Sequence, residues 1–195
     1  MFENLSMYEA VKLTAEKYPN NLAVYYQGKK INYRNFIKRV DRMADILYHR
    51  LGVRQNDVVL VAQPNIPDTL VLTYAINKIG AVTNFVHPYT PYNQIHNIMI
   101  KTRTKVAFIF EQRVAKEVKS YRRISENIYV TRVEDDLPIF KKAFYHTFMD
   151  GAIRKKLGKY RGQFAGFNYV SKLKPTGLPV ETVKGKQNDV SVLLH

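Results

Sequence analysis

One strand–helix–strand pattern in the middle of the chain constrains the fold more than any other feature. Residues 57–62 are a short run of Val and Leu, typical of a strand buried on both faces. Pro67 suits the first turn of a helix, and Gly80 suits its end because glycine readily adopts the left-handed conformation. A second apolar run at residues 81–86 completes the unit, which predicts two parallel strands joined by a right-handed crossover. The apolar stripe expected on its helix is Leu70, Leu72, Ala75, Ile76 and Ile79.

The same alternation continues after this unit. We expect a helix from Pro91 to about residue 102, a buried strand at 105–110, a helix at about 113–123 and a strand at 127–131. Strands that alternate with helices predict an α/β fold of three layers, in which helices flank a mostly parallel sheet. The strand-like end of the chain, residues 189–195, is expected to join that sheet in parallel.

A helix–hairpin–helix segment is predicted before the sheet. Ser6 and Glu9 form a capping-box pattern that opens a helix to about residue 18. Residues 22–32 indicate a hairpin, after which Asn32 can cap a second helix. The candidates for the buried side of the first helix are Met7, Val11, Ala15 and Tyr18.

This pattern divides the chain into two parts. Residues 1–53 are predicted to be the N-terminal helix–hairpin–helix segment, and residues 54–195 the α/β subdomain. Within the second part, a helix is expected at about residues 137–157, followed by a stretch rich in Gly, aromatic residues and Lys. Because that stretch is a poor core segment, we interpret residues 136–186 as an irregular basic insertion or a long connection.

The charge of the chain is strongly basic and unevenly distributed. The formal net charge is +15, and residues 141–175 hold nine Lys or Arg against one acid. A balance this basic favours an anionic partner. Basic residues interleaved with aromatic ones can form a solvated connection, bind single-stranded nucleic acid or contact an anionic membrane surface. The residues predicted to make a membrane or anion contact are Lys155, Lys156, Lys159 and Arg161.

Composition excludes several other classes. The chain has no Cys, so it forms no disulfide and no thiolate metal site, and none of its five His pairs with another at metal-ligand spacing. The N-terminus lacks a secretory signal pattern, and no apolar run approaches the roughly 20 residues of a membrane span. Asp135 and Asp136 lie in a polar turn and are expected to be solvated. These features predict a cytoplasmic protein, with peripheral association at the membrane as an alternative, and no metal site in this chain.

Three stretches, in this order and spacing, resemble the N-terminal portion of AMP-forming acyl-CoA synthetases, within the adenylate-forming superfamily. Residues 31–36 (INYRNF) are similar to the pattern [LI]-[TS]-Y-x-E-[LF], although Asn32 and Asn35 replace the usual hydroxyl cap and Glu. Residues 78–88 (KIGAVTNFVHP) are similar to the K-x-G-A-[VI] junction and its continuation. Residues 188–195 (NDVSVLLH) resemble the strand that leads into the phosphate-binding loop of the family.

The resemblance implies an ATP-dependent ligase. Such an enzyme activates a fatty acid as an acyl-adenylate, with Mg²⁺ accompanying ATP, and passes the acyl group to CoA. His87 and His195 would contact substrate beside the crevice and the phosphate loop. The later motifs of the family, including the phosphate loop and the catalytic Lys, are absent. We therefore expect no catalytic residue, no bound cofactor and no activity in this chain alone.

A second interpretation from the residues is a basic, non-enzymatic α/β module that binds an anionic membrane surface or nucleic acid. Salt dependence separates the two, because binding to a polyanion weakens steeply with salt. For the ligase we expect no specific nucleic-acid partner. The sequence predicts neither the acyl chain length, nor the acceptor thiol, nor the oligomeric state.

Overall fold

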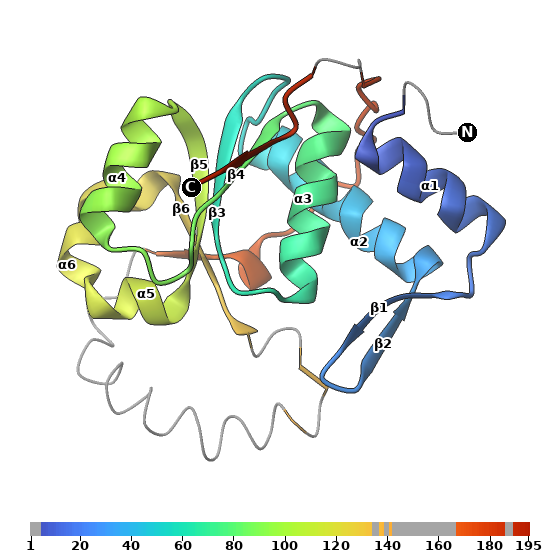
Figure 1. The fold of residues 1–195 in the computed structure, drawn as a ribbon, viewed down its shortest axis with the longest axis horizontal. Coiled ribbons are helices and arrows are strands. Elements are labelled where there is room, and N and C mark those ends of the chain that lie inside the picture. The colour runs from blue at the N-terminus through green and yellow to red at the C-terminus, as the bar shows by residue number, and fades with distance from the viewer. Residues whose placement is uncertain (1–4, 134–136, 139–140, 142–166, 186–188) are drawn as a thin grey trace.

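The computed structural model describes residues 5–133, 137–138, 141, 167–185 and 189–195 (Figure 1). Six parallel strands form one sheet in the order β7-β6-β5-β3-β4-β8, and helices cover both of its faces. The predicted three-layer α/β fold is therefore confirmed. The strands of this sheet are β3 (Val58–Ala62), β4 (Val82–Phe85), β5 (Thr104–Phe110), β6 (Ile128–Thr131), β7 (Asn168–Tyr169) and β8 (Val192–Leu194).

A helix, a hairpin and a second helix precede this sheet, as the sequence predicts. The hairpin is a separate antiparallel pair of β1 (Leu22–Tyr26) and β2 (Lys29–Asn32). A π-helical turn (Ile46–Arg50) extends the second helix by five residues. The α-helices in the described part of the chain are α1 (Met7–Lys17), α2 (Tyr33–Asp45), α3 (Pro67–Ile79), α4 (Tyr92–Lys101), α5 (Glu111–Lys116) and α6 (Val118–Tyr121).

The two predicted N-caps are present. The Glu9 backbone N–H donates to Ser6 Oγ over 3.2 Å, and the Ser6 N–H donates to Glu9 Oε2 over 2.8 Å, so α1 begins with a complete capping box. The Asn35 N–H donates to Asn32 Oδ1 over 2.9 Å at the start of α2. Asn32 therefore replaces the hydroxyl cap of the family pattern without loss of the cap.

The central unit has the predicted bounds within one residue. Pro67 occupies the first turn of α3, and Gly80 ends the helix with φ +74°. β3 pairs with β4 in parallel. Side chains of β3 alternate between two apolar clusters, with Val59 and Val61 on one face and Leu60 and Ala62 on the other. This double burial explains why the strand reads as an unbroken apolar run.

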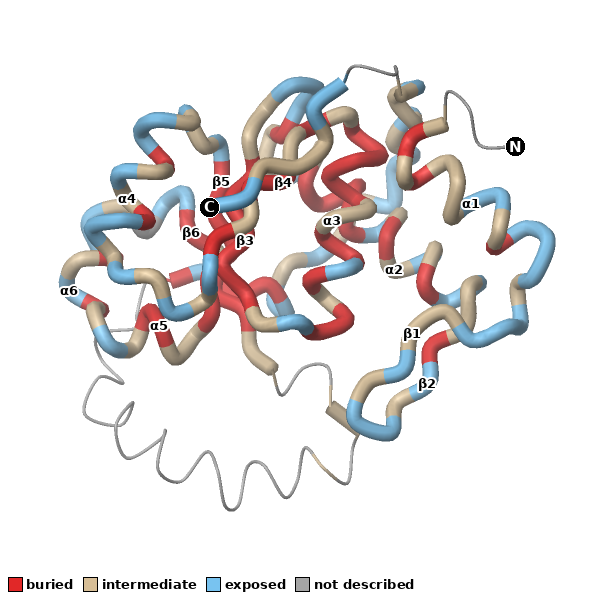
Figure 2. Tube along the Cα trace, in the orientation of Figure 1, coloured by how far each residue is buried: buried red, intermediate tan, exposed pale blue. Residues whose placement is uncertain are grey.

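The two faces of the sheet carry different helices. The cluster that contains Val59 also contains buried side chains of α2 and α3. The cluster that contains Leu60 contains buried side chains of α4, α5 and α6. Figure 2 shows the buried residues concentrated along the sheet and on the inner sides of the helices, and α1 lies outside α2 and α3. The sheet is thus the central layer between two helical layers.

Two expectations about buried side chains are wrong. Tyr18 was expected in the core, but it is exposed, and Tyr8 is buried instead because its ring faces α2 and α3. Leu70 is also exposed, whereas its neighbour Val71 is buried. α3 packs against helices as well as against the sheet, so the buried side of this helix differs from the predicted stripe.

The later part of the chain departs further from the sequence prediction. The helix expected at residues 113–123 is broken at Glu117, where φ is −135° and ψ is 40°. β7 was not predicted, yet it pairs in parallel with β6, and Phe167 and Tyr169 are buried. Part of the predicted insertion therefore belongs to the core. The helix expected at about residues 137–157 lies almost entirely outside the described residues.

Candidate functional site at the carboxyl edge of the sheet

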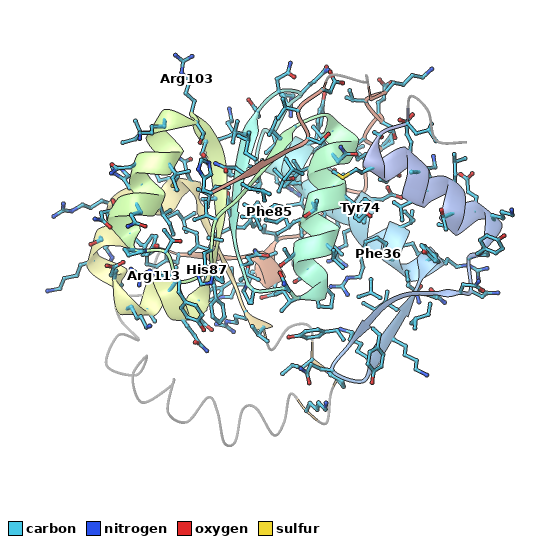
Figure 3. The ribbon with its side chains drawn as sticks, viewed as in Figure 1. Phe36, Tyr74, Phe85, His87, Arg103 and Arg113 are labelled. Atoms are coloured by element: carbon cyan, nitrogen blue, oxygen red, sulfur yellow. The ribbon has the colours of Figure 1, made fainter. Side chains whose placement is uncertain are left out.

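All six strands end at one edge of the sheet because all of their pairings are parallel. His87 follows β4 after one residue, and His195 follows β8 directly. The His195 N–H donates to the carbonyl oxygen of Phe85, the last residue of β4, over 3.3 Å. The topology therefore brings both predicted histidines to the same edge. Figure 3 shows His87 at this edge and Arg103, which precedes β5, at the opposite one.

The strand order reverses at this edge beside β3. α3 carries the chain from β3 to β4 over one face, and α4 carries it from β4 past β3 to β5 over the other face. In open α/β sheets, ligands bind outside the carboxyl ends of the strands at such a reversal. The candidate site therefore lies beyond the ends of β3, β5 and β4.

His87 lies in an exposed turn that several aromatic contacts support. Its Nδ1 accepts a hydrogen bond from the Tyr89 N–H at 3.3 Å, so the ring proton is on Nε2 when the imidazole is neutral. The Tyr89 ring lies 6.0 Å from the Phe110 ring in an edge-on arrangement, and Lys116 Nζ lies 5.3 Å from its centre. The turn therefore presents Nε2 of His87 as the ring nitrogen available to a ligand.

A buried polar network fixes the loop after β3. Gln63 is 5% exposed, and its Nε2 donates to Thr131 Oγ1 at the end of β6. Thr69 Oγ1 lies 3.1 Å from Gln63 Oε1 and 2.8 Å from the Pro64 carbonyl oxygen. Buried polar groups need such partners, because an unpaired one costs about 1–3 kcal/mol. The network therefore holds the ends of β3 and β6 and the first turn of α3 in one arrangement.

A second cluster joins the ends of β5, β6 and β7. Tyr169 donates its hydroxyl hydrogen bond to Glu111 Oε1 over 3.2 Å, and Arg132 Nε lies 3.3 Å from the same oxygen. The Arg132 guanidinium also lies 4.0 Å from the centre of the Tyr169 ring. Burial raises the pKa of Tyr169, and Arg132 offsets only part of that rise. Tyr169 is thus a neutral hydrogen-bond donor at physiological pH.

Sequence reasoning did not identify these two clusters. Their members are ordinary polar residues without motif spacing, such as Gln63 and Thr131, which are 68 residues apart. The available signal was position, because Gln63, Glu111 and Arg132 each follow a predicted parallel strand and Thr131 ends one. That signal could have indicated Gln63 and Arg132, but it could not have indicated Tyr169, whose strand was not predicted.

The other predicted contact residues cannot be placed. Lys155, Lys156, Lys159 and Arg161 lie outside the described residues. Among the residues that are described, no group of three or more His, Cys, Asp or Glu is arranged to hold a metal ion. No helix in the described ranges is both long and apolar enough to cross a bilayer.

Comparison with known proteins identifies the family. The profile of AMP-binding enzymes matches residues 11–189, which is most of the chain. The chain belongs to the AMP-binding enzyme family. The sequence resemblance to adenylate-forming enzymes is therefore confirmed.

Individual relatives are distant and much longer. Acetyl-coenzyme A synthetase 1 of Saccharomyces cerevisiae is 25% identical over 143 residues, which cover 69% of this chain and 20% of that protein. The 4-coumarate–CoA ligase-like 8 protein of Arabidopsis thaliana is 30% identical over 110 residues, which cover 56% of this chain and 19% of that protein. This AMP-binding chain thus spans about a fifth of the length of these curated relatives.

Solved structures agree on the fold. The coronafacic acid ligase of Pectobacterium brasiliense superimposes with a TM-score of 0.60 at 17% identity, over 65% of this chain and 25% of that one. A fatty acyl CoA synthetase of Mycobacterium tuberculosis gives a TM-score of 0.55 at 22% identity, over 60% and 23%. At these identities the likeness supports the α/β architecture of the AMP-binding chain.

Proposed function

We propose that this chain is part of an ATP-dependent acyl-CoA synthetase that acts on a fatty acid. The observation that carries the proposal is the parallel pairing of β8 with β4. Because of this pairing, the last residue of the 188–195 motif lies at the same edge of the sheet as His87 and Pro88. The family resemblance requires this arrangement. Two relatives described as acyl-CoA or acetyl-CoA synthetases support the same reaction class.

The proposed reaction has two steps. A carboxylate oxygen of the fatty acid attacks the α-phosphorus of ATP, forming the acyl-adenylate and releasing pyrophosphate. The thiol of CoA then attacks the acyl carbon, the thioester forms, and AMP leaves. His87 and His195 are proposed to contact substrate at the carboxyl edge, where Nε2 of His87 is available to donate a hydrogen bond.

The residues of this chain do not fit a complete site for ATP and Mg²⁺. The sequence contains no Gly-rich phosphate cradle, and the described carboxylates include no group of three or more that could hold a cation. We therefore assign no catalytic step to a side chain of this chain. We propose that the phosphate-binding and catalytic groups belong to other parts of the protein, and that the chain alone is inactive.

Pyrophosphate exchange tests this proposal. The 195-residue chain should show no fatty-acid-dependent exchange of pyrophosphate into ATP, because it lacks the groups that stabilise the transition state. The longer polypeptide from the same reading frame should show it, and the residues encoded after His195 should begin with a Ser/Thr/Gly-rich run ending near Pro-Lys. Heat-sensitive exchange by the short chain, or no exchange by the long one with any acid, would contradict the proposal.

We further propose that the protein is cytoplasmic and peripheral to the membrane, where fatty acids partition. The basic composition of residues 141–175 supports this location. Changing Lys155, Lys156, Lys159 and Arg161 together to Gln should then reduce co-sedimentation with anionic vesicles. If this variant and the wild type sediment equally, residues 141–175 are a solvated connection and do not hold the protein at the membrane.

A further inference from the structure

α2 carries a stripe of cations on the side opposite the core. Arg34, Lys38 and Arg42 are all exposed and recur every four residues, so they lie along one side of the helix. Successive members are about 6 Å apart along the helix axis. Phe36 and Val40 are buried on the other side, against α3 and the sheet. We call these three cations the α2 stripe.

The acids of α2 do not neutralise this stripe. Asp41 Oδ1 accepts from Lys78 Nζ over 2.8 Å and from the Tyr8 hydroxyl over 2.7 Å. Asp45 is buried and accepts three hydrogen bonds from Thr176 and Gly177. Both carboxylates of the helix therefore bond to groups outside the stripe. The α2 stripe has no acid partner among the described residues, and it presents three positive charges to solvent.

A cleft with apolar walls opens beside the stripe. Its volume is about 220 Å³, and it lies between α2, the start of α3 and the segment that follows β7. Arg39 and Arg42 contribute its cations, and Arg39 pairs with Asp68 over 2.5 Å. Lys172 and Lys174 are exposed on either side of Leu173, one of its wall residues. The apolar residues that line it are Met43, Ile46, Val71, Val170 and Leu173.

We propose that the α2 stripe and this cleft dock the protein on an anionic bilayer. The stripe supplies charge for lipid phosphates and carboxylates, and Leu173, the one apolar wall residue that is not buried, suits the region just below a head group. A nucleic acid would satisfy the cations but offers no apolar phase for Leu173, which lies between the exposed Lys172 and Lys174. The proposal does not depend on the proposed ligase reaction, because it concerns only where the chain is held.

Vesicle co-sedimentation of the 195-residue chain tests the docking surface. Vesicles of phosphatidylserine and phosphatidylcholine should bind the chain, and vesicles of phosphatidylcholine alone should not. Binding should weaken as the salt rises from about 50 mM to about 300 mM, since screening shortens the reach of the charges. Each surface cation contributes roughly fivefold to partitioning onto anionic vesicles. The partitioning of the variant Arg34→Gln, Lys38→Gln, Arg42→Gln should therefore fall about 100-fold.

A charge-matched control makes the test specific to this surface. The variant Lys101→Gln, Lys105→Gln, Lys119→Gln removes the same charge from exposed sites on α4, β5 and α6, and α4 and α6 lie on the other face of the sheet. The partitioning of this control onto anionic vesicles should fall only a few-fold. Circular dichroism should show that both variants fold. Equal losses by the two variants would overturn the proposal. So would an absence of binding to the anionic vesicles, and stripe-dependent binding to single-stranded DNA would then point to a nucleic acid instead.

Discussion

Gly80 shows how a single residue of the family motif is tied to the tertiary structure. It ends α3 in the left-handed region, at φ +74°. A Cβ added there would lie 2.8 Å from Val183 Cγ1 and 3.1 Å from Gln55 Cγ. The Val183 N–H also donates to the carbonyl of Lys78 over 2.9 Å, so the segment before β8 runs directly across the motif. The glycine therefore serves both the turn and the close approach of a distant segment.

The variant Gly80→Ala should lower the free energy of unfolding by about 2–4 kcal/mol, from left-handed strain together with the displacement of Val183. Gly52→Ala is the matched control, because Gly52 has φ +67° and no atom within 4 Å of its added Cβ. In that control only the left-handed strain should lower the free energy of unfolding, by about 1–2 kcal/mol. Urea denaturation measures both. Equal losses would show that the approach of Val183 contributes nothing.

At the scale of elements, Asp45 attaches the extended segment before β8 to α2. Its carboxylate accepts from the Thr176 hydroxyl over 2.6 Å, the Gly177 N–H over 2.7 Å and the Thr176 N–H over 3.1 Å. Burial by itself raises the pKa of Asp45, but these hydrogen bonds outweigh it and the pKa is lowered. The ionised form is thus more stable in the folded chain than in the unfolded one. That stability is present above the unfolded pKa, near 3.9, and is lost as the pH falls through the folded pKa.

We expect Asp45→Asn to lower the free energy of unfolding at pH 7 by about 1–3 kcal/mol. The amide NH2 group that replaces one carboxylate oxygen is a donor, and it would face the donors of Thr176 and Gly177. The difference from the wild type should shrink below about pH 4, where the wild-type carboxylate is itself protonated. Denaturation at pH 7 and at pH 3 measures the effect, and Glu16→Gln, at an exposed position, is the control. A difference that does not change with pH would mean that the charge of Asp45 is not what attaches the segment.

At the scale of the whole molecule, the net charge of +15 acts against the compact state. Like charges lie closer together in the folded chain than in the unfolded one, so their repulsion favours unfolding. Exposed cations such as the α2 stripe add to this effect, and salt screens it. We therefore expect the fold to be more stable against heat when counterions are present.

The midpoint of thermal unfolding should rise by a few degrees between about 10 mM and about 150 mM NaCl, since a change of 1 kcal/mol shifts it by about 2–4 °C in a chain of this size. Differential scanning calorimetry measures it. Sodium sulfate at equal ionic strength should add a further rise from its general effect on burial. A midpoint that falls with NaCl would show that favourable ion pairs, such as Lys78–Asp41, dominate over the net repulsion.

The sequence by itself determined most of the elements from α1 to β6 and their order. Pro67 and Gly80 bound a helix through their own backbone preferences, and apolar runs such as residues 57–62 specify buried strands wherever they pack. The parallel direction of β8 also followed, because the family resemblance requires its end to lie beside the end of β4. Each of these inferences depends on residues that are close together in the chain or on a motif.

Only the tertiary structure decided which distant residues meet. Gln63 reaches Thr131 across 68 residues, and Asp45 reaches Thr176 across 131. β7 is a strand because β6 presents an open edge to it, and its two residues are too few to form a pattern of their own. Such contacts carry no periodicity or spacing. The free energy that selects them comes from burial and hydrogen bonding that exist only once the chain has folded.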